Sequence, residues 1–259
     1  RLWQENGGST AAYLKSLIPD WGERVTGSAQ VDTWLASDLT NKQLADTCGF
    51  TLDQIGSDES SSMADEGVQY VSLSQFNAAR QLAGEKPIEL AADEYLVDNT
   101  VDKSAKYAQA LGQKGRTITV DGHELTASGQ VVSQSLQVSS MSCLLAVLVV
   151  PDELAADRFA AGDFPYLSEL NVNLASDSQE QAMKDMVAEY GKAAPPSEEL
   201  AEKGWTYDPG AWPVSYYDTS ESVVADSMGL TLLLVYLAPP VFASTVATSV
   251  STDLKVKSS

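Results

Sequence analysis

A long uncharged stretch rich in apolar residues lies near the C-terminal end of the sequence, between Asp226 and Asp253. As a helix, residues 227–252 would rise about 39 Å, which exceeds the roughly 30 Å of a bilayer's hydrocarbon core. The leucine-rich part from Met228 to Ala238 predicts the start of a membrane-spanning helix. Residues 227–252 are therefore a candidate transmembrane segment, followed by a tail over residues 253–259.

Two prolines, Pro239 and Pro240, interrupt this stretch, and a half rich in serine and threonine follows them. Proline inside a helix removes a hydrogen bond and costs about 3 kcal/mol. The alternative interpretation is a buried core strand that ends at Pro239. Lys255 and Lys257 follow the segment, whereas the chain before it is acidic, and this charge placement favours the membrane interpretation.

The charge balance limits the partners of the chain. Sixteen Lys and Arg residues against 36 Asp and Glu residues give a net charge of −20. This charge excludes a nucleic-acid partner, since phosphate binding needs a cationic surface, and it disfavours docking on an anionic lipid leaflet. It favours a cationic ligand, such as a positively charged peptide. Because no basic and apolar signal segment precedes Arg1, we expect the chain to be part of a longer protein.

Residues 1–50 are predicted to be a helical segment. Apolar residues recur there at helical spacing, in a first patch closed by Pro19 and in a second formed by Val31, Trp34, Leu35 and Leu39. A further short helix is expected over Asn41–Cys48, with Gly49 as its C-terminal cap.

Residues 68–190 are predicted to form a sheet-containing core. Strands are expected at 68–72, 94–97, 144–150 and 170–174, helices at 72–82, 100–111 and 177–190 and after Pro151, and a hairpin at 117–126 around Asp121-Gly122. Ser72 and Gln75 have the spacing of a capping box. Residues 205–213, with two prolines and one glycine, are predicted to form a turn-rich connection. The alternation predicts an α+β domain over residues 1–226, with a mixed sheet and flanking helices.

Few residues suit catalysis or metal binding. His123 is the single histidine and lies beside the hairpin turn, where a solvated side chain is expected. Cys48 and Cys143 are the two cysteines, and their sequence positions leave open whether they form a disulfide. The acidic loop 56–67 lacks the ligand spacing of a calcium loop, although it contains Asp58, Glu59, Asp65 and Glu66. We therefore expect no catalytic residue, no cofactor and no metal site.

Several short motifs between residues 68 and 154 occur in a characteristic order. The motifs are a strand leading into a helix (Ser72, Ser74, Phe76 and Asn77), a turn (Gly84, Lys86 and Pro87), a strand (Asp93, Glu94 and Tyr95), a hairpin (Ile118, Val120, Gly122, Glu124 and Leu125) and a strand end (Val149, Val150, Pro151 and Asp152). This order resembles the large extracellular domain of FtsX-like ABC transporter permeases, in particular the bacitracin-export type of Gram-positive bacteria. The helix after that domain begins much like Gly229–Ala238, and the chain departs from the family at Pro239-Pro240.

The resemblance implies a domain on the extracellular side of the cell membrane, held between two transmembrane helices. Such a domain recognises a peptide antibiotic, alone or with a cell-wall lipid, and a separate ATP-binding subunit supplies the energy. A sensor kinase is a further expected partner, and the domain itself is not expected to be an enzyme. The alternatives are a permease of the same superfamily for lipoprotein release or cell-wall hydrolase regulation, and a surface-anchored binding module without a transport role.

Overall fold

The computed structural model describes residues 7–51, 54, 64–99, 105–132, 147–175, 182, 185, 186, 188, 189, 192, 210–215 and 230–235. Its strands are β1 (Val25–Thr40), β2 (Gly67–Ser72), β3 (Glu94–Asp98), β4 (Thr117–Val120), β5 (His123–Val132), β6 (Val147–Val150), β7 (Leu167–Leu174), β8 (Gly210–Ser215) and β9 (Leu230–Val235). Its helices are α2 (Thr10–Leu17), α3 (Trp21–Arg24), α4 (Asn41–Cys48), α5 (Leu73–Leu82), α6 (Ala105–Leu111) and α7 (Asp152–Ala160).

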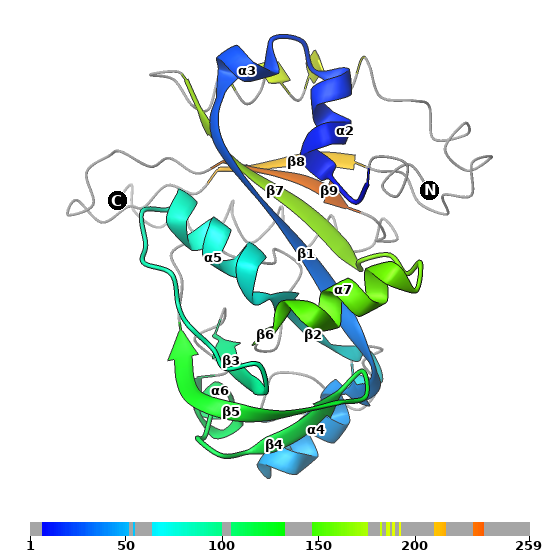
Figure 1. Cartoon of the computed structure of the whole chain (residues 1–259), viewed down its shortest axis with the longest axis vertical. Coiled ribbons are helices and arrows are strands. Elements are labelled where there is room, and N and C mark those ends of the chain that lie inside the picture. Colours follow the sequence, from blue (N-terminus) through cyan, green and yellow to red (C-terminus); the bar gives the residue numbers. More distant parts are fainter. Residues whose placement is uncertain are drawn as a thin grey trace, which may run out of the picture.

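The described strands form one sheet in the order β4-β5-β3-β6-β2-β1-β7-β9-β8. The pairs β3–β5 and β2–β6 are parallel, and the other neighbours are antiparallel. Helices pack against this sheet (Figure 1). The predicted α+β class, with a mixed sheet and flanking helices, is therefore confirmed.

Strand β1 is sixteen residues long and belongs to two parts of the sheet. Its first half, Val25–Thr33, pairs with β7, and its second half pairs with β2 from Trp34 onward. We call β1's first half with β7, β9 and β8 the proximal half-sheet, and β1's second half with β2, β6, β3, β5 and β4 the distal half-sheet. Figure 1 shows β1 running from one to the other. A single continuous strand thus joins the two halves.

The prediction of a helix over the second apolar patch of residues 1–50 was wrong, because Val31, Trp34 and Leu35 lie in β1. Residues 31–34 of this strand are all buried, as helices or strands cover it on both faces. A strand buried on both faces does not alternate, so its apolar residues fell at helical spacing by coincidence. The predictions of helices before Pro19 and over Asn41–Cys48 are confirmed by α2 and α4, and Gly49 caps α4 with φ 77°.

Three apolar clusters hold the layers together. One face of the distal half-sheet packs on α4 and α6, around Tyr70, Tyr95 and Leu148. The other face packs on α5, and this cluster continues onto β1 through Ala29 and Val31. The third cluster places α2 and α3 on the proximal half-sheet at Leu170, Val172 and Leu174. The core therefore extends along both halves.

Most elements predicted for residues 68–190 are confirmed. Strands β2, β3, β6 and β7 and helices α5, α6 and α7 occupy the expected regions, and residues 100–104 and 144–146 lie outside the described part. The hairpin β4–β5 has the predicted turn, with positive φ at both Asp121 (48°) and Gly122 (79°), as a type I′ turn requires. Within the predicted helix 177–190, the described residues are helical, namely Ala182, Asp185, Met186, Ala188 and Glu189.

The predicted capping box at Ser72 was wrong, since Ser72 makes no side-chain cap at α5. The Gln75 side chain binds Asp32 instead, and the backbone N–H of Ser74 donates to Asp152 Oδ1 at 2.8 Å. A carboxylate from the start of α7 thus takes an N–H of the first turn of α5. A capping box occurs at α4, where Thr40 and Gln43 bond reciprocally.

The C-terminal strands β8 and β9 extend the proximal half-sheet. Gly210–Ser215, part of which was predicted as a turn-rich connection, forms the outer strand β8, where Pro213 is tolerated because an edge strand has a free side. Within the candidate transmembrane segment, Leu230–Val235 forms strand β9 and not the helix that the membrane interpretation predicted, in agreement with the alternative interpretation of a core strand. The rest of residues 227–252 lies outside the described part. Among the described residues, the helices are too short or too polar to cross a membrane.

Asn77 holds the turn that follows α5. Its Nδ2 donates to Ile88 O and its Oδ1 accepts from Ile88 N, each at 2.8 Å. We expect Asn77→Ala to lower the free energy of unfolding by about 1–2 kcal/mol, because two backbone groups lose their partner. Urea unfolding measures this change, with the exposed Gln81→Ala on the same helix as a control that changes little. Equal stability of the two variants would contradict the role of Asn77.

Candidate functional site

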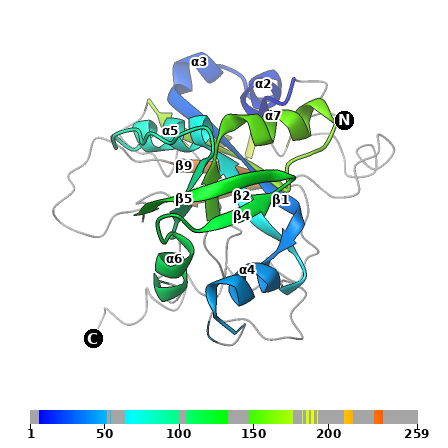
Figure 2. The same cartoon turned by 60° about the horizontal axis from the view of Figure 1, so that its bottom comes forward.

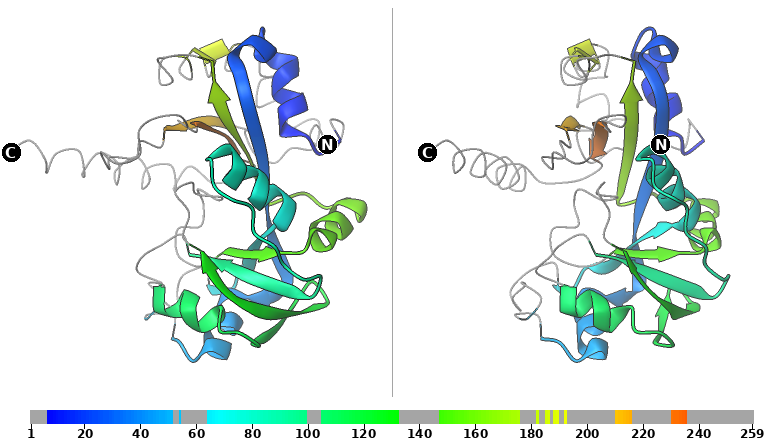
Figure 3. Two further views of the ribbon diagram at one scale, coloured as in Figure 1. Left: turned by 60° about the vertical axis from the view of Figure 1, so that its left-hand side comes forward. Right: turned by 90° about the vertical axis from the view of Figure 1, so that its left-hand side faces the viewer.

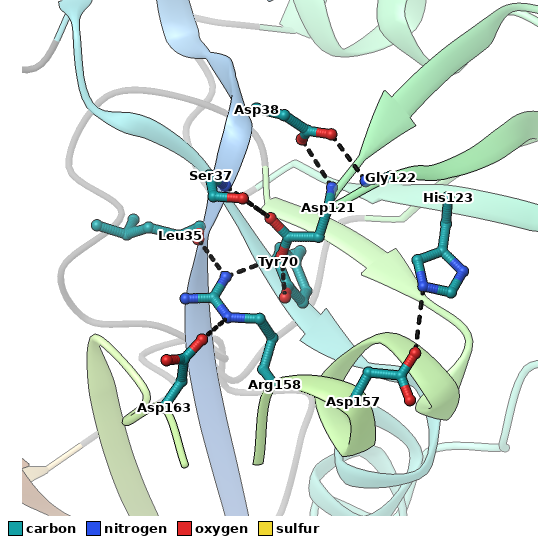
Figure 4. A network of polar contacts seen from close by, with 10 residues as sticks. All are labelled: Leu35, Ser37, Asp38, Tyr70, Asp121, Gly122, His123, Asp157, Arg158 and Asp163. Atoms are coloured by element: carbon teal, nitrogen blue, oxygen red, sulfur yellow. Dashed lines mark hydrogen bonds and ion pairs between the residues drawn. The ribbon is translucent and has the colours of Figure 1, made fainter. Parts of the chain in front are cut away.

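The densest polar network surrounds the tip of the β4–β5 hairpin (Figure 4). The Asp121 carboxylate accepts from Ser37 N and Ser37 Oγ at 2.7 Å, from Tyr70 Oη at 2.6 Å and from Arg158 Nη1 at 2.9 Å. In return, Asp38 accepts the backbone N–H groups of Asp121 and Gly122, both at 2.7 Å. We call Ser37, Asp38, Tyr70, Asp121 and Arg158 the hairpin clasp.

Arg158, from α7, is held on several sides within the clasp. Its guanidinium also donates to Leu35 O at 3.0 Å and to Asp163, and it lies 5.5 Å from the centre of the Trp34 ring. Burial acts to lower the pKa of Arg158, but the bonds to Asp121 and Asp163 outweigh it and raise that pKa. Burial likewise acts to raise the pKa of Asp121, and the hydrogen bonds from Tyr70, Ser37 and Arg158 lower it. Both groups are therefore held in their charged forms.

The clasp joins strands that are far apart in the sheet order. Strand β4 is the outermost strand of the distal half-sheet, whereas Ser37 and Asp38 belong to β1 at its other side. Figure 2 shows the β4–β5 hairpin lying across the front of β1 and β2. The distal half-sheet is therefore curled, and the clasp fixes the hairpin tip to β1. Its paired and buried charges stabilise this shape, so the clasp is a structural lock.

A second polar network lies where β1 passes from β7 to β2. Asp32 accepts from Gln30 Nε2, Gln75 Nε2 and Ser168 Oγ, and its backbone N–H donates to Gln75 Oε1 at 2.8 Å. The Gln75 side chain thus accepts a backbone hydrogen bond from β1 at Asp32, two residues before β1 begins to pair with β2. Burial raises the pKa of the Asp32 carboxyl, and the three neutral donors lower it only in part. We call these four residues the sheet junction.

Neither network has the composition of a catalytic centre. His123 Nε2 lies 3.3 Å from Asp157 Oδ2, and both side chains are exposed, so this contact does not form the buried, oriented pair of a catalytic acid or base. The predicted solvated position of His123 at the hairpin is confirmed. Within the described ranges, three or more His, Cys, Asp or Glu side chains do not gather into a metal-sized group.

The remaining sequence candidates are only partly among the described residues. Cys48 packs, partly buried, against the distal core, where burial raises the pKa of its thiol. Cys143, Asp58 and Glu59 lie outside the described residues. Burial raises the pKa of Glu66, and its backbone carbonyl accepts from Asn41 N, which ties the end of the acidic loop to α4.

Two cavities flank α3 on the proximal half-sheet. One, of about 360 Å³, lies between the end of β7 and the described helical residues between Ala182 and Lys192, with an apolar floor at Leu174 and Met186 and the paired charges Arg24 and Glu189 at its rim. The other, of about 570 Å³, runs along the start of β1. Both have volumes in the range of ligand pockets. They are the candidate binding surfaces of the described chain.

Sequence reasoning missed Asp32, Gln75 and Arg158. For Asp32, the one available signal was that it is the single charged residue in the run VTGSAQVDT. Arg158 gave none, since its partners Leu35 and Asp121 are distant in sequence. Comparison with known proteins adds no identification, because no protein-family model, curated protein or solved structure matches the chain.

Proposed function

We propose that this chain is the extracellular ligand-recognition domain of an FtsX-like ABC transporter permease. In this function the domain binds a peptide antibiotic, alone or with a cell-wall lipid, and transmits binding to membrane helices that a separate ATPase subunit drives. The motifs between Ser72 and Asp152 are the basis of the proposal. In the structure several of them make contacts that determine the fold, including Asn77 to Ile88 and Asp152 to Ser74.

The observation that carries the proposal is where the two ends of the described chain lie. Helix α2, at the beginning, packs on Leu170 and Val172 of β7, and β9, at the end, pairs with the same strand. A domain inserted between two membrane helices must receive and return its chain on one side. The shared position of α2 and β9 on the proximal half-sheet supports such an insertion (Figure 3).

Strand β1 supplies a physical route for coupling. It runs without interruption from the proximal half-sheet, near both described ends, to the curled distal half-sheet. A ligand shifts a conformational equilibrium only if it binds one state better than the other. A stiff strand shared by both halves can carry such a difference from one half-sheet to the other.

The test is the complete reading frame and its neighbourhood. We expect membrane-spanning segments on both sides of the described domain, and an adjacent gene for an ATP-binding subunit that co-purifies with the protein. A frame that encodes no membrane segment contradicts the proposal. A frame with one segment and no ATPase partner favours the surface-anchored binding module.

Binding of cationic peptides should weaken as salt rises, because the net charge of −20 attracts them through a screened interaction. Isothermal titration calorimetry from about 0.05 to 0.5 M salt measures the affinity across the screening range. An uncharged analogue of the peptide, with glutamine for lysine, serves as the control. Affinity that is equal at all salt concentrations would remove the electrostatic part of the proposal.

A further inference from the structure

Within the described part of the chain, the first residues of β1 have a strand neighbour on one side only. Strand β7 pairs with Val25–Thr33, whereas β2 joins the opposite side only from Trp34 onward. In Figure 1, α2 and α5 lie on opposite sides of β1, and the right-hand view of Figure 3 shows β7 beside the upper part of β1. Among the described residues, the edge of β1 away from β7 therefore lies open between these two helices.

The larger cavity follows this edge. Four consecutive residues of the strand, Val25–Ser28, line it, together with Lys15, Trp21 and Gly22. Because successive side chains of a strand point to opposite faces, a cavity over one face would be lined by alternate residues. A cavity lined by four consecutive residues runs along the strand's edge. It is a groove that exposes backbone.

The backbone groups of Ser28 point into this groove. The Asp32 N–H donates to Gln75, away from β7, and the register from Ser28 to Asp32 is unbroken. In an antiparallel ladder every second residue points the same way, so the N–H and C=O of Ser28 also point away from β7. The Ser28 side chain is exposed. These groups are placed to pair with another strand.

The edge also lacks the usual protection against pairing. Natural edge strands are blunted with lysine, proline or other charged residues. Between Arg24 and Asp32 the sequence is VTGSAQV, seven residues without charge or proline, in a chain of which 20% is charged. An exposed, uncharged edge of this kind is a surface for strand addition.

We propose that this groove binds an extended peptide, which adds to β1 as a strand at Val25–Ser28. The inference rests on the proposed function and assigns its peptide ligand to a site. The pairing residues of the peptide are uncharged, matching the neutral edge, and its flanks are positively charged, matching the acidic chain. Trp21, which is mostly buried, lines one end of the groove, and the exposed Lys15 lies at its rim.

The test uses the acetylated and amidated peptide KTVTVTK as probe, with the isotope-labelled chain observed by NMR. We expect shift changes and slowed amide exchange at Val25–Ser28. Ser28→Pro removes an outward N–H without removing a bond to β7, and it should weaken binding by about tenfold or more. The matched control is Thr119→Pro. Thr119 is an exposed residue on β4, and its N–H also points away from the partner strand β5.

N-methylation of the probe gives a second readout that leaves the protein unchanged. Methylating one alternate set of residues removes the donors on one edge of the peptide and should abolish binding, whereas methylating the other set should not. Absence of binding, shifts elsewhere on the chain, or equal binding by the Ser28→Pro variant would overturn the inference. These outcomes leave the membrane topology and the ATPase partner, on which the proposed function is tested, unaffected.

Discussion

Replacing Arg158 by methionine should lower the free energy of unfolding by about 2–4 kcal/mol, because the change leaves the Asp121 carboxylate buried without its cation. The Asp121 side chain is 9% exposed and the Arg158 side chain 22%. Methionine keeps much of the packing against Trp34, so the loss reports on the charge and its hydrogen bonds. Urea unfolding followed by tryptophan fluorescence measures it.

The matched control is Arg24→Met at the end of α3, which packs on the proximal half-sheet. Arg24 donates twice to Glu189, at 2.6 and 3.1 Å, but both side chains are about one-third exposed. An ion pair so exposed contributes no more than about 1 kcal/mol. A double variant with Asp121→Asn should recover part of the stability lost in Arg158→Met, since asparagine tolerates the positive φ at position 121 and carries no charge. Equal losses at Arg158 and Arg24 would show that the clasp is not a lock.

The sequence predicted elements whose causes are local. The Asp121-Gly122 turn, the glycine that ends α4 and the apolar run of β6 each follow from a few neighbouring residues. It failed where a distant contact decides the structure. Strand β1 lost its alternation because α5 covers one face and α2 the other, and the side chain of Gln75 left its own helix to bond Asp32 across 43 positions. The clasp and the junction join elements distant in sequence, so neither shows as a local pattern.

The hairpin clasp and the sheet junction stabilise different parts of the sheet, and their contributions to stability change in opposite directions with pH. The pKa of Asp121 is lowered in the folded chain, so its contribution to stability is present above its ordinary value of 3.8 and is lost as pH falls through the folded value. The pKa of Asp32 is raised, so its contribution is present below 3.8 and is lost as pH rises through the folded value. Acidification therefore weakens the distal lock and strengthens the junction between the half-sheets.

Replacing Asp32 by alanine should lower the free energy of unfolding by about 2–4 kcal/mol, because the Gln75 amide and the Ser168 hydroxyl lose a buried partner and a cavity remains. Asp32→Asn tests the charge separately. Its side chain does not ionise, so the stability of the natural chain relative to this variant should decrease as pH rises from about 3.5 to 8.

The control for the Asp32 series is Asp157→Asn on α7, whose side chain is 71% exposed and whose replacement should change stability by no more than about 0.5 kcal/mol at any pH. A stability difference between the natural chain and Asp32→Asn that stays constant or increases with pH would mean that Asp32 is not a destabilised buried carboxylate. If this difference decreases with rising pH while the stability of the natural chain relative to Arg158→Met increases, the sheet junction and the hairpin clasp can be destabilised separately.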